Sequence, residues 1–139
     1  MRKLFITDIH GEYNGMMKLL EHADFQPSSD QLVIGGDMVS RGNDSGLVLK
    51  GVRRLALQHP TNVVALMGNH EEMMSWYFQG KSDLWLRHAG KHTLSKVKKT
   101  FRQENELQEH VAWAASLPLL HQDHQYVYTH AGIVPYVSM

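Results

Sequence analysis

Three short polar motifs carry the residues of this chain that are best suited to chemistry. They are residues 8–11 (Asp-Ile-His-Gly), 36–42 (Gly-Asp-Met-Val-Ser-Arg-Gly) and 68–71 (Gly-Asn-His-Glu). Their carboxylate, imidazole and amide groups are oxygen and nitrogen ligands, which suit manganese, iron or zinc. Two divalent ions about 3.5–4 Å apart form a clamp for phosphoryl transfer, and one carboxylate can bridge both ions. The motifs therefore predict phosphoryl chemistry at a pair of divalent cations.

Five residues are candidate metal ligands. Asp8 and His10 are separated by one residue, so both side chains can point to the same side of an extended strand end. Together with Asp37 they form one ligand set, and Asn69 and His130 add a second set, with Asp37 as the candidate bridge. A water between two such ions is deprotonated near neutral pH and attacks phosphorus in line. We expect a phosphate ester to be hydrolysed by this route.

Two residues are suited to handling the phosphate itself. Arg41 follows Asp37 by four positions, and its planar guanidinium can bind two phosphate oxygens at once. His70 is adjacent to Asn69 and can protonate the leaving oxygen, because imidazole titrates near neutral pH. We therefore predict that Arg41 and His70 are catalytic, and that Arg41, Asn69 and His70 contact the substrate.

The motifs follow apolar runs that are typical of buried strands. Residues 3–7, 31–34 and 62–67 are rich in Ile, Val, Leu or Phe and are bounded by glycine and polar residues. The segments between them have the apolar spacing of helices. Strands that alternate with helices form a parallel sheet, and ligands collect beyond the carboxyl ends of its strands. The sequence therefore predicts an α/β fold with all three motifs at one edge of the sheet.

Helices and then a hairpin are expected in the rest of the chain. The helices have expected bounds near 71–80, 82–101 and 104–116. The second of them breaks at Gly90. Residues 119–121 and 126–130 then form a hairpin that brings His130 to the end of its second strand. The other histidines are expected at surface or turn positions: His22, His59, His88, His92, His110, His121 and His124.

The composition predicts a single domain over residues 1–139. The formal net charge is zero, so bulk electrostatics gives no reason to expect a nucleic-acid or membrane partner. There are no cysteines, which excludes disulfides and thiolate metal sites. No apolar run is long enough to cross a membrane, and the first one is interrupted too early for a signal peptide. We expect a cytoplasmic protein that recognises ligands through local sites.

The three motifs, together with His130-Ala131-Gly132, resemble the signature blocks of the calcineurin-like metallophosphoesterases. Within that superfamily they are similar to the bacterial and phage serine/threonine phosphoprotein phosphatases. The resemblance implies a β-sandwich with flanking helices, a βαβαβ start and a carboxy-terminal hairpin. It also implies hydrolysis of phosphomonoesters, with phosphoserine and phosphothreonine in proteins as the leading substrates. Two divalent ions would be the cofactors, manganese first, with iron or zinc as alternatives.

The same resemblance assigns a role to each site residue. Asp8, His10 and Asp37 would hold the first metal ion. Asp37 would bridge to the second ion, which Asn69 and His130 would also bind. His70 would be the general acid and Arg41 the phosphate clamp.

Two positions leave the substrate class open. The phosphoprotein phosphatases usually carry Asp just before the arginine of the second motif, where it orients the general-acid histidine, and this chain has Ser40 there. Small residues at that position are common in the related symmetrical diadenosine tetraphosphatases. Glu71 favours the phosphoprotein enzymes, because the nucleotide enzymes more often end that motif in Asp. Hydrolysis of a dinucleoside tetraphosphate is therefore the alternative function, so a phosphorylated protein and a nucleotide are both expected substrates.

Members of the resembled family usually continue well beyond the length of this chain. They supply another metal-binding histidine, and often a second phosphate-binding arginine, after the His-Ala-Gly block. We therefore expect the second half of the family fold to be missing and the second metal to lack one protein ligand. A metal-binding domain without turnover is one consequence to test. Another is a homodimer in which two chains complete each other's fold.

Overall fold

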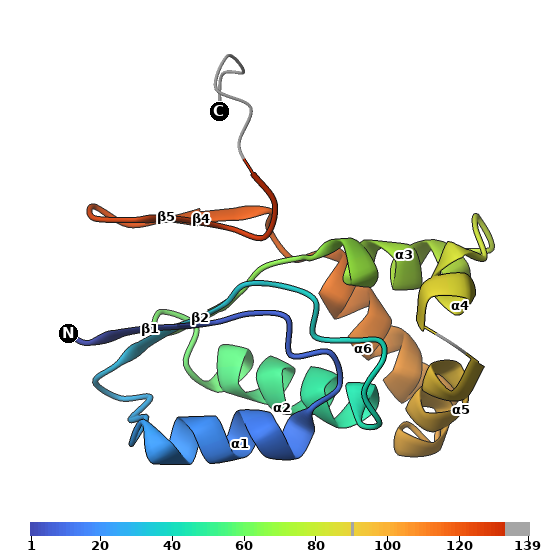
Figure 1. The fold of residues 1–139 in the computed structure, drawn as a ribbon, viewed down its shortest axis with the longest axis horizontal. Coiled ribbons are helices and arrows are strands. Elements are labelled where there is room, and N and C mark those ends of the chain that lie inside the picture. Colours follow the sequence, from blue (N-terminus) through green and yellow to red (C-terminus); the bar gives the residue numbers. More distant parts are fainter. Residues whose placement is uncertain (90, 133–139) are drawn as a thin grey trace.

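The computed structural model describes residues 1–89 and 91–132, and its centre is a three-stranded parallel sheet (Figure 1). The strands are β1 (Lys3–Ile6), β2 (Gln31–Ile34) and β3 (Val63–Ala65), in the order β1-β2-β3. Ile6 pairs with Ile34, and Ile34 pairs with Ala65, so the three strands end at the same level. This arrangement confirms the predicted α/β class and brings the three motifs to one edge of the sheet.

Two crossover helices cover one face of the parallel sheet. They are α1 (Tyr13–His22) and α2 (Ser45–Gln58), and they lie on the opposite side of the sheet from the hairpin in Figure 1. Leu32 and Ile34 of β2 share a buried apolar core with Met16 of α1 and Val48 of α2. Burial of alternate strand residues against an apolar helix stripe explains why these segments fold as they do.

Four further helices form a group at one end of the molecule. They are α3 (Asn69–Phe78), α4 (Leu84–Ala89), α5 (Lys91–Thr100) and α6 (Glu104–Ala115). Trp85 is fully buried among them, with its ring centroid 5.8 Å from that of Tyr77 and 5.9 Å from that of Phe78. The predicted break between two helices is confirmed by the end of α4 and the start of α5, while Gly90 lies outside the described residues.

His110 of α6 is not at the surface, and the prediction for this histidine was wrong. Its side chain is buried, and its ring centroid lies 4.3 Å from that of Phe101. It follows Leu107 by three positions and precedes Ala114 by four, and both of these residues are buried. The helical repeat therefore turns His110 inward, where its Nδ1–H donates to the Glu106 carbonyl (2.8 Å). Burial lowers the pKa of His110.

The predicted hairpin is present, and it covers the other face of the sheet. It consists of the antiparallel strands β4 (Leu120–Gln122) and β5 (Val127–Thr129). Lys3 of β1 donates to the Asp123 carboxylate (2.9 Å), and the ring of Phe5 lies 5.7 Å from that of Tyr128. Helices, parallel sheet and hairpin thus form successive layers (Figure 1). Among the described residues, none of the helices combines the length and apolar character needed to cross a membrane.

Candidate metal and phosphate site

The first two motifs are joined by backbone hydrogen bonds beyond the strand ends. The Asp8 N–H donates to the Gly36 carbonyl (3.0 Å), and the His10 N–H donates to the Asp37 carbonyl (2.9 Å). Asp8, His10 and Asp37 all have positive φ angles, of 55°, 46° and 53°. Such left-handed backbone costs about 1–2 kcal/mol for each non-glycine residue and clusters at functional sites. The backbone therefore adopts an uncommon, left-handed conformation at the candidate ligands.

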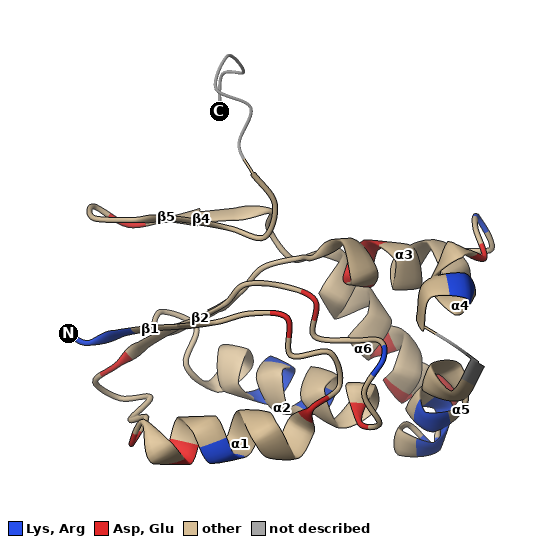
Figure 2. Ribbon diagram, in the orientation of Figure 1, with Lys and Arg blue, Asp and Glu red and all other residues tan. Residues whose placement is uncertain are grey.

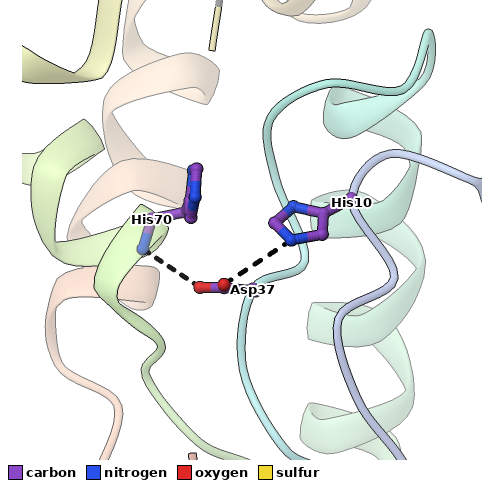
Figure 3. Close-up of side chains that lie close together, drawn as sticks. All are labelled: His10, Asp37 and His70. Carbon is purple, nitrogen blue, oxygen red and sulfur yellow. Dashed lines mark hydrogen bonds and ion pairs between the residues drawn. The ribbon is translucent and has the colours of Figure 1, made fainter. Parts of the chain in front are cut away.

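The carboxylate of Asp37 is the centre of the site. It is buried, and its Oδ2 lies 3.6 Å from His10 Nε2 and 3.4 Å from His130 Nε2. Asp8 Oδ1 lies 3.7 Å from the same nitrogen of His10. Figure 3 shows His10 and His70 on either side of the Asp37 carboxylate. Residues that the sequence singled out in three separate motifs and the hairpin thus meet around one acid.

Both histidines that face Asp37 are oriented by backbone carbonyls. His10 Nδ1 lies 3.0 Å from the Val39 carbonyl, and His130 Nδ1 lies 2.9 Å from the Gly35 carbonyl. A carbonyl only accepts, so each Nδ1 carries the proton and, in a neutral ring, Nε2 presents its lone pair toward Asp37. This is the usual orientation of a metal-ligating histidine.

Asn69 completes the cluster from the first turn of α3. Its side-chain amide approaches His130 Nε2 to 3.0 Å, and the same amide position lies 3.2 Å from both oxygens of Asp37. With no cation between them, the amide NH₂ would face these acceptors, whereas a cation would be met by the amide oxygen. Within the described part of the chain, the ion pairs of Asp8 and Asp37 are all with histidines. Lone pairs and negative charge therefore converge without a basic side chain, which fits divalent cations.

Two groups of three ligand atoms share Asp37. Asp8, Asp37 and His130 form one group and His10, Asp37 and His70 form the other, with the atoms of each group within 4.8 Å of one another. The shared Asp37 agrees with its expected position as a bridge. Asp8 Oδ1 is close to His10 Nε2 as well, at 3.7 Å, so these distances do not divide the remaining ligands between two ions. The individual roles remain predictions.

His70 occupies the buried side of this cluster. Its backbone N–H donates to Asp37 Oδ1 (3.0 Å), as Figure 3 shows, and its ring lies edge-on to that of His10 at 4.9 Å. Burial lowers the pKa of His70, and the charges of His10 and Arg41 act in the same direction, while Asp37 opposes them. Its Nδ1 is buried without a hydrogen-bond partner in the structure's described residues. Burial therefore disfavours the charged imidazole, and the nearby Asp37 carboxylate favours it.

Ser40 makes a different contact from the one expected of its position. Its Oγ accepts a hydrogen bond from Trp85 Nε1 (2.9 Å), and its N–H donates to Ser45 Oγ (2.9 Å). Ser40 is fully buried and is committed to these partners rather than to His70.

Arg41 extends from the second motif toward solvent. Its side chain is exposed, and across residues 1–89 and 91–132 it makes no ion pair with an acidic residue, so it is available to an anion. Its carbonyl lies 3.2 Å from Nε2 of His92, in the first turn of α5. His92 was predicted to be a surface or turn residue, and sequence reasoning missed this contact because the partners are 51 positions apart.

Glu71 is the main site residue whose role the sequence did not reveal. It is fully buried, and its two carboxylate oxygens accept four backbone N–H groups. Burial raises the pKa of Glu71, while its bonds from Gly68, Val39 and Asp37 act in the opposite direction. Its place at the third position of α3, where an acid caps a helix start, is the signal that could have found it.

Known proteins resemble this chain along almost its whole length. A family model described as calcineurin-like phosphoesterase matches residues 1–138. A symmetrical bis(5'-nucleosyl)-tetraphosphatase from Erwinia tasmaniensis is 35% identical over 138 residues, which cover 97% of this chain and 46% of that protein. The chain thus spans about half the length of this relative.

Solved structures show the same fold at lower sequence identity. A protein serine/threonine phosphatase from Saccharomyces cerevisiae matches with a TM-score of 0.63 at 23% identity, covering 86% of this chain and 38% of that one. A cold-active protein-tyrosine phosphatase of a Shewanella species matches with a TM-score of 0.70 at 23% identity, covering 94% and 42%. These similarities extend to the fold, and both proteins continue well beyond the matched part.

Proposed function

This chain belongs to the calcineurin-like phosphoesterase family, and from that premise we propose that it hydrolyses phosphate esters and anhydrides with the help of divalent metal ions. The observation that carries the proposal is the convergence of Asp8, His10, Asn69 and His130 on the buried carboxylate of Asp37. Oriented imidazoles and an unneutralised carboxylate are the features that such metal ions need.

Different residues of the site would bind the metal ions, bind the phosphate and donate a proton. Asp8, His10, Asp37, Asn69 and His130 would hold two divalent ions, which when bound would supply Lewis acidity toward water and phosphate oxygens. Arg41 would bind non-bridging oxygens of the phosphate through its two-pronged guanidinium. Water loses a proton to solvent as it adds to phosphorus, the bond from phosphorus to the leaving oxygen breaks, and His70, protonated for this step, would deliver its proton to that oxygen.

A dinucleoside tetraphosphate is the substrate that we propose. The relative from Erwinia tasmaniensis, 35% identical to this chain, carries the name of a symmetrical tetraphosphatase. Basic residues also gather on α5, whose first turn contacts Arg41 (Figure 2). Lys96 and Lys99 follow His92 by four and seven positions, so all three share one exposed side of α5. Two lysines on the helix that contacts Arg41 suit a substrate with several consecutive phosphates.

A phosphorylated protein becomes the second candidate, although the sequence placed it first. Glu71 was the residue that favoured it, and in the structure this side chain binds backbone amides rather than facing solvent. The Glu71 side chain is therefore not available to contact a substrate. The solved protein phosphatases are 23% identical to this chain, which supports a shared fold and not a shared substrate.

Hydrolysis of three substrates by the purified chain with Mn²⁺ tests the proposal. The substrates are a symmetrical dinucleoside tetraphosphate, a phosphoserine peptide and an aryl phosphate. Removal of a ligand charge in Asp37→Asn should lower kcat by at least about a hundredfold, as loss of electrostatic stabilisation does elsewhere. The control is Asp83→Asn, an exposed carboxylate that pairs with Arg87 at 3.2 Å. Equal activity in wild type and Asp37→Asn would contradict the assignment.

Two further outcomes of this experiment separate the alternatives. Preference for the phosphopeptide over the tetraphosphate would make the second candidate the function. Binding of metal without turnover of any substrate would identify a metal-binding domain. Metal content measured by elemental analysis supplies the stoichiometry in each case.

A further inference from the structure

We propose that Glu71 is a positioning residue that holds Asp37 in place for metal binding, an inference that rests on the proposed function in taking Asp37 as a metal ligand. Glu71 lies in α3 and Asp37 in the loop after β2, and 34 positions separate them in the sequence. Its side chain touches neither substrate nor metal in this role. Glu71 would influence metal affinity indirectly, because it binds backbone N–H groups of the second motif and so holds Asp37 in position.

The two oxygens of Glu71 divide four donors between them. Oε1 accepts from the N–H groups of Asp37 (2.7 Å) and Gly68 (2.9 Å). Oε2 accepts from the N–H groups of Met38 (2.9 Å) and Val39 (3.2 Å). The carboxylate thereby fixes three consecutive residues of the second motif against the start of the third.

A hydrogen bond in the opposite direction closes this arrangement. The Asp37 carboxylate accepts the backbone N–H of His70 (3.0 Å), at the start of the helix that carries Glu71. Each acid therefore binds the backbone beside the other. Asp37 cannot shift without breaking bonds at both ends, and its left-handed backbone (φ 53°) needs such support.

The glycines around this contact allow the second and third motifs to approach more closely than residues with a Cβ atom could. A Cβ atom on Gly36 would lie 2.7 Å from the Gly68 nitrogen and 2.9 Å from His130 Nδ1. A Cβ on Gly68 would overlap both the backbone nitrogen and the carboxylate of Asp37. The second and third motifs are thus packed backbone against backbone, with Glu71 as the buried anion that satisfies their N–H groups.

The chemistry of this contact requires a carboxylate. Glutamine would replace one acceptor oxygen by an NH₂ group, which would face N–H donors and leave them unsatisfied. Buried donors without partners cost about 1–3 kcal/mol. Aspartate would keep the charge but has a shorter reach. We therefore expect Glu71→Gln to displace Asp37 more than Glu71→Asp does.

Mn²⁺ binding to the full chain, measured by titration calorimetry, tests the inference without relying on turnover. Loss of an outer-sphere support typically weakens metal affinity by 10–100-fold, so Glu71→Gln should raise the Mn²⁺ dissociation constant by about this factor. Glu71→Asp should recover part of the loss. The matched control is Glu72→Gln in the same helical turn, because the Glu72 side chain is partly exposed and makes no hydrogen bond or ion pair with the residues that the structure describes. Wild-type affinity in a folded Glu71→Gln protein would overturn the proposal.

Hydrogen exchange on the wild-type protein keeps the inference testable if the variants do not fold. The amides of Asp37, Met38 and Val39 should be protected in the presence of a chelator, because a buried carboxylate binds them. Rapid exchange at these amides would refute the contact. Failure of the proposed function looks different, since the chain would then bind Mn²⁺ in a Glu71-dependent manner and hydrolyse none of the substrates.

Discussion

At the scale of single residues, the site is organised by the partners of its ligands. His10 and His130 each donate Nδ1–H to a backbone carbonyl, and Asp37 accepts the His70 N–H. These bonds fix where the free lone pairs point before any cation arrives. Little rearrangement is then needed on binding, which favours affinity.

Two buried histidines make stability depend on pH. Burial lowers the pKa of both His70 and His110 below the usual value for histidine. The unfolded chain therefore binds more protons than the folded chain near that pH, and stability rises with pH where this holds. The free energy of unfolding of the metal-free protein should fall as the pH decreases through about 6.5.

Denaturant unfolding at a series of pH values between about 5 and 8 measures this effect. His110→Gln should make the slope shallower, because it removes one of the two groups. The matched control is His124→Gln, at an exposed position in the hairpin. A slope that His110→Gln leaves unchanged would contradict the expected contribution of its burial.

The candidate ligands could be found from the sequence because each follows an apolar run. Strand ends at one edge of a parallel sheet must lie close together, so position alone brought Asp8, His10 and Asp37 into one site. The contacts of Glu71 and His92 could not be predicted in this way, because their partners are backbone groups 34 and 51 positions away. The spacing of residues in a sequence does not predict a contact of that kind.

At the scale of secondary structure, the apolar pattern of the sequence predicted which helices and strands form more accurately than it predicted their first and last residues. Gln31–Ile34 was predicted with its observed bounds, whereas the apolar run 62–67 contains the shorter strand Val63–Ala65. Leu66 is buried, and its N–H still donates to the Ile34 carbonyl of β2 (2.8 Å), so an apolar run continues past the last residue of the strand. His110 was missed for the complementary reason, because a polar residue on an inward face has no apolar signature.

Two glycines in helices predict opposite effects of the same substitution. A Cβ on Gly15 of α1 would meet only the Glu12 Cβ, at 3.7 Å, so Gly15→Ala should stabilise the protein by about 0.5–1 kcal/mol. A Cβ on Gly46 of α2 would lie 2.7 Å from the Thr100 side chain of α5. Gly46→Ala should therefore destabilise by about 1–3 kcal/mol.

Urea unfolding of the two variants measures both changes under identical conditions. Each variant is the control for the other, because the residue added and the helical context are the same. Stabilisation by Gly46→Ala would show that α2 and α5 are not in the close contact described above.

At the scale of the whole molecule, the hairpin side leaves apolar side chains exposed. Phe5 on β1 is 50% exposed, and Leu119, Tyr126 and Val127 in and beside the hairpin are 66%, 56% and 44% exposed. Both hairpin strands also present edges that are free to pair within the described structure. Such a surface favours contact with further protein.

We expect the 139-residue chain to form dimers through this surface, with two copies covering each other's hairpins. Sedimentation velocity over a range of concentrations should show a monomer–dimer equilibrium. Leu119→Asp should shift it toward monomer, because a charge would have to be buried. Leu57→Asp is the matched control, at a residue of α2 that is 61% exposed. A monomer at every concentration would argue against self-association.

His130 gives this cysteine-free chain a possible cross-link of another kind. It lies against Gly35, 95 positions earlier, and its Nε2 faces the Asp37 carboxylate. A cation shared by His130 and Asp37 would join these distant segments in the folded chain alone. It would stabilise the fold by binding to it, whereas a disulfide acts mainly by restricting the unfolded chain. At about one hundred times its dissociation constant, such a ligand adds about 2.7 kcal/mol to the stability of the fold. The supply of metal would then govern how long the protein survives heat, as well as how fast it works.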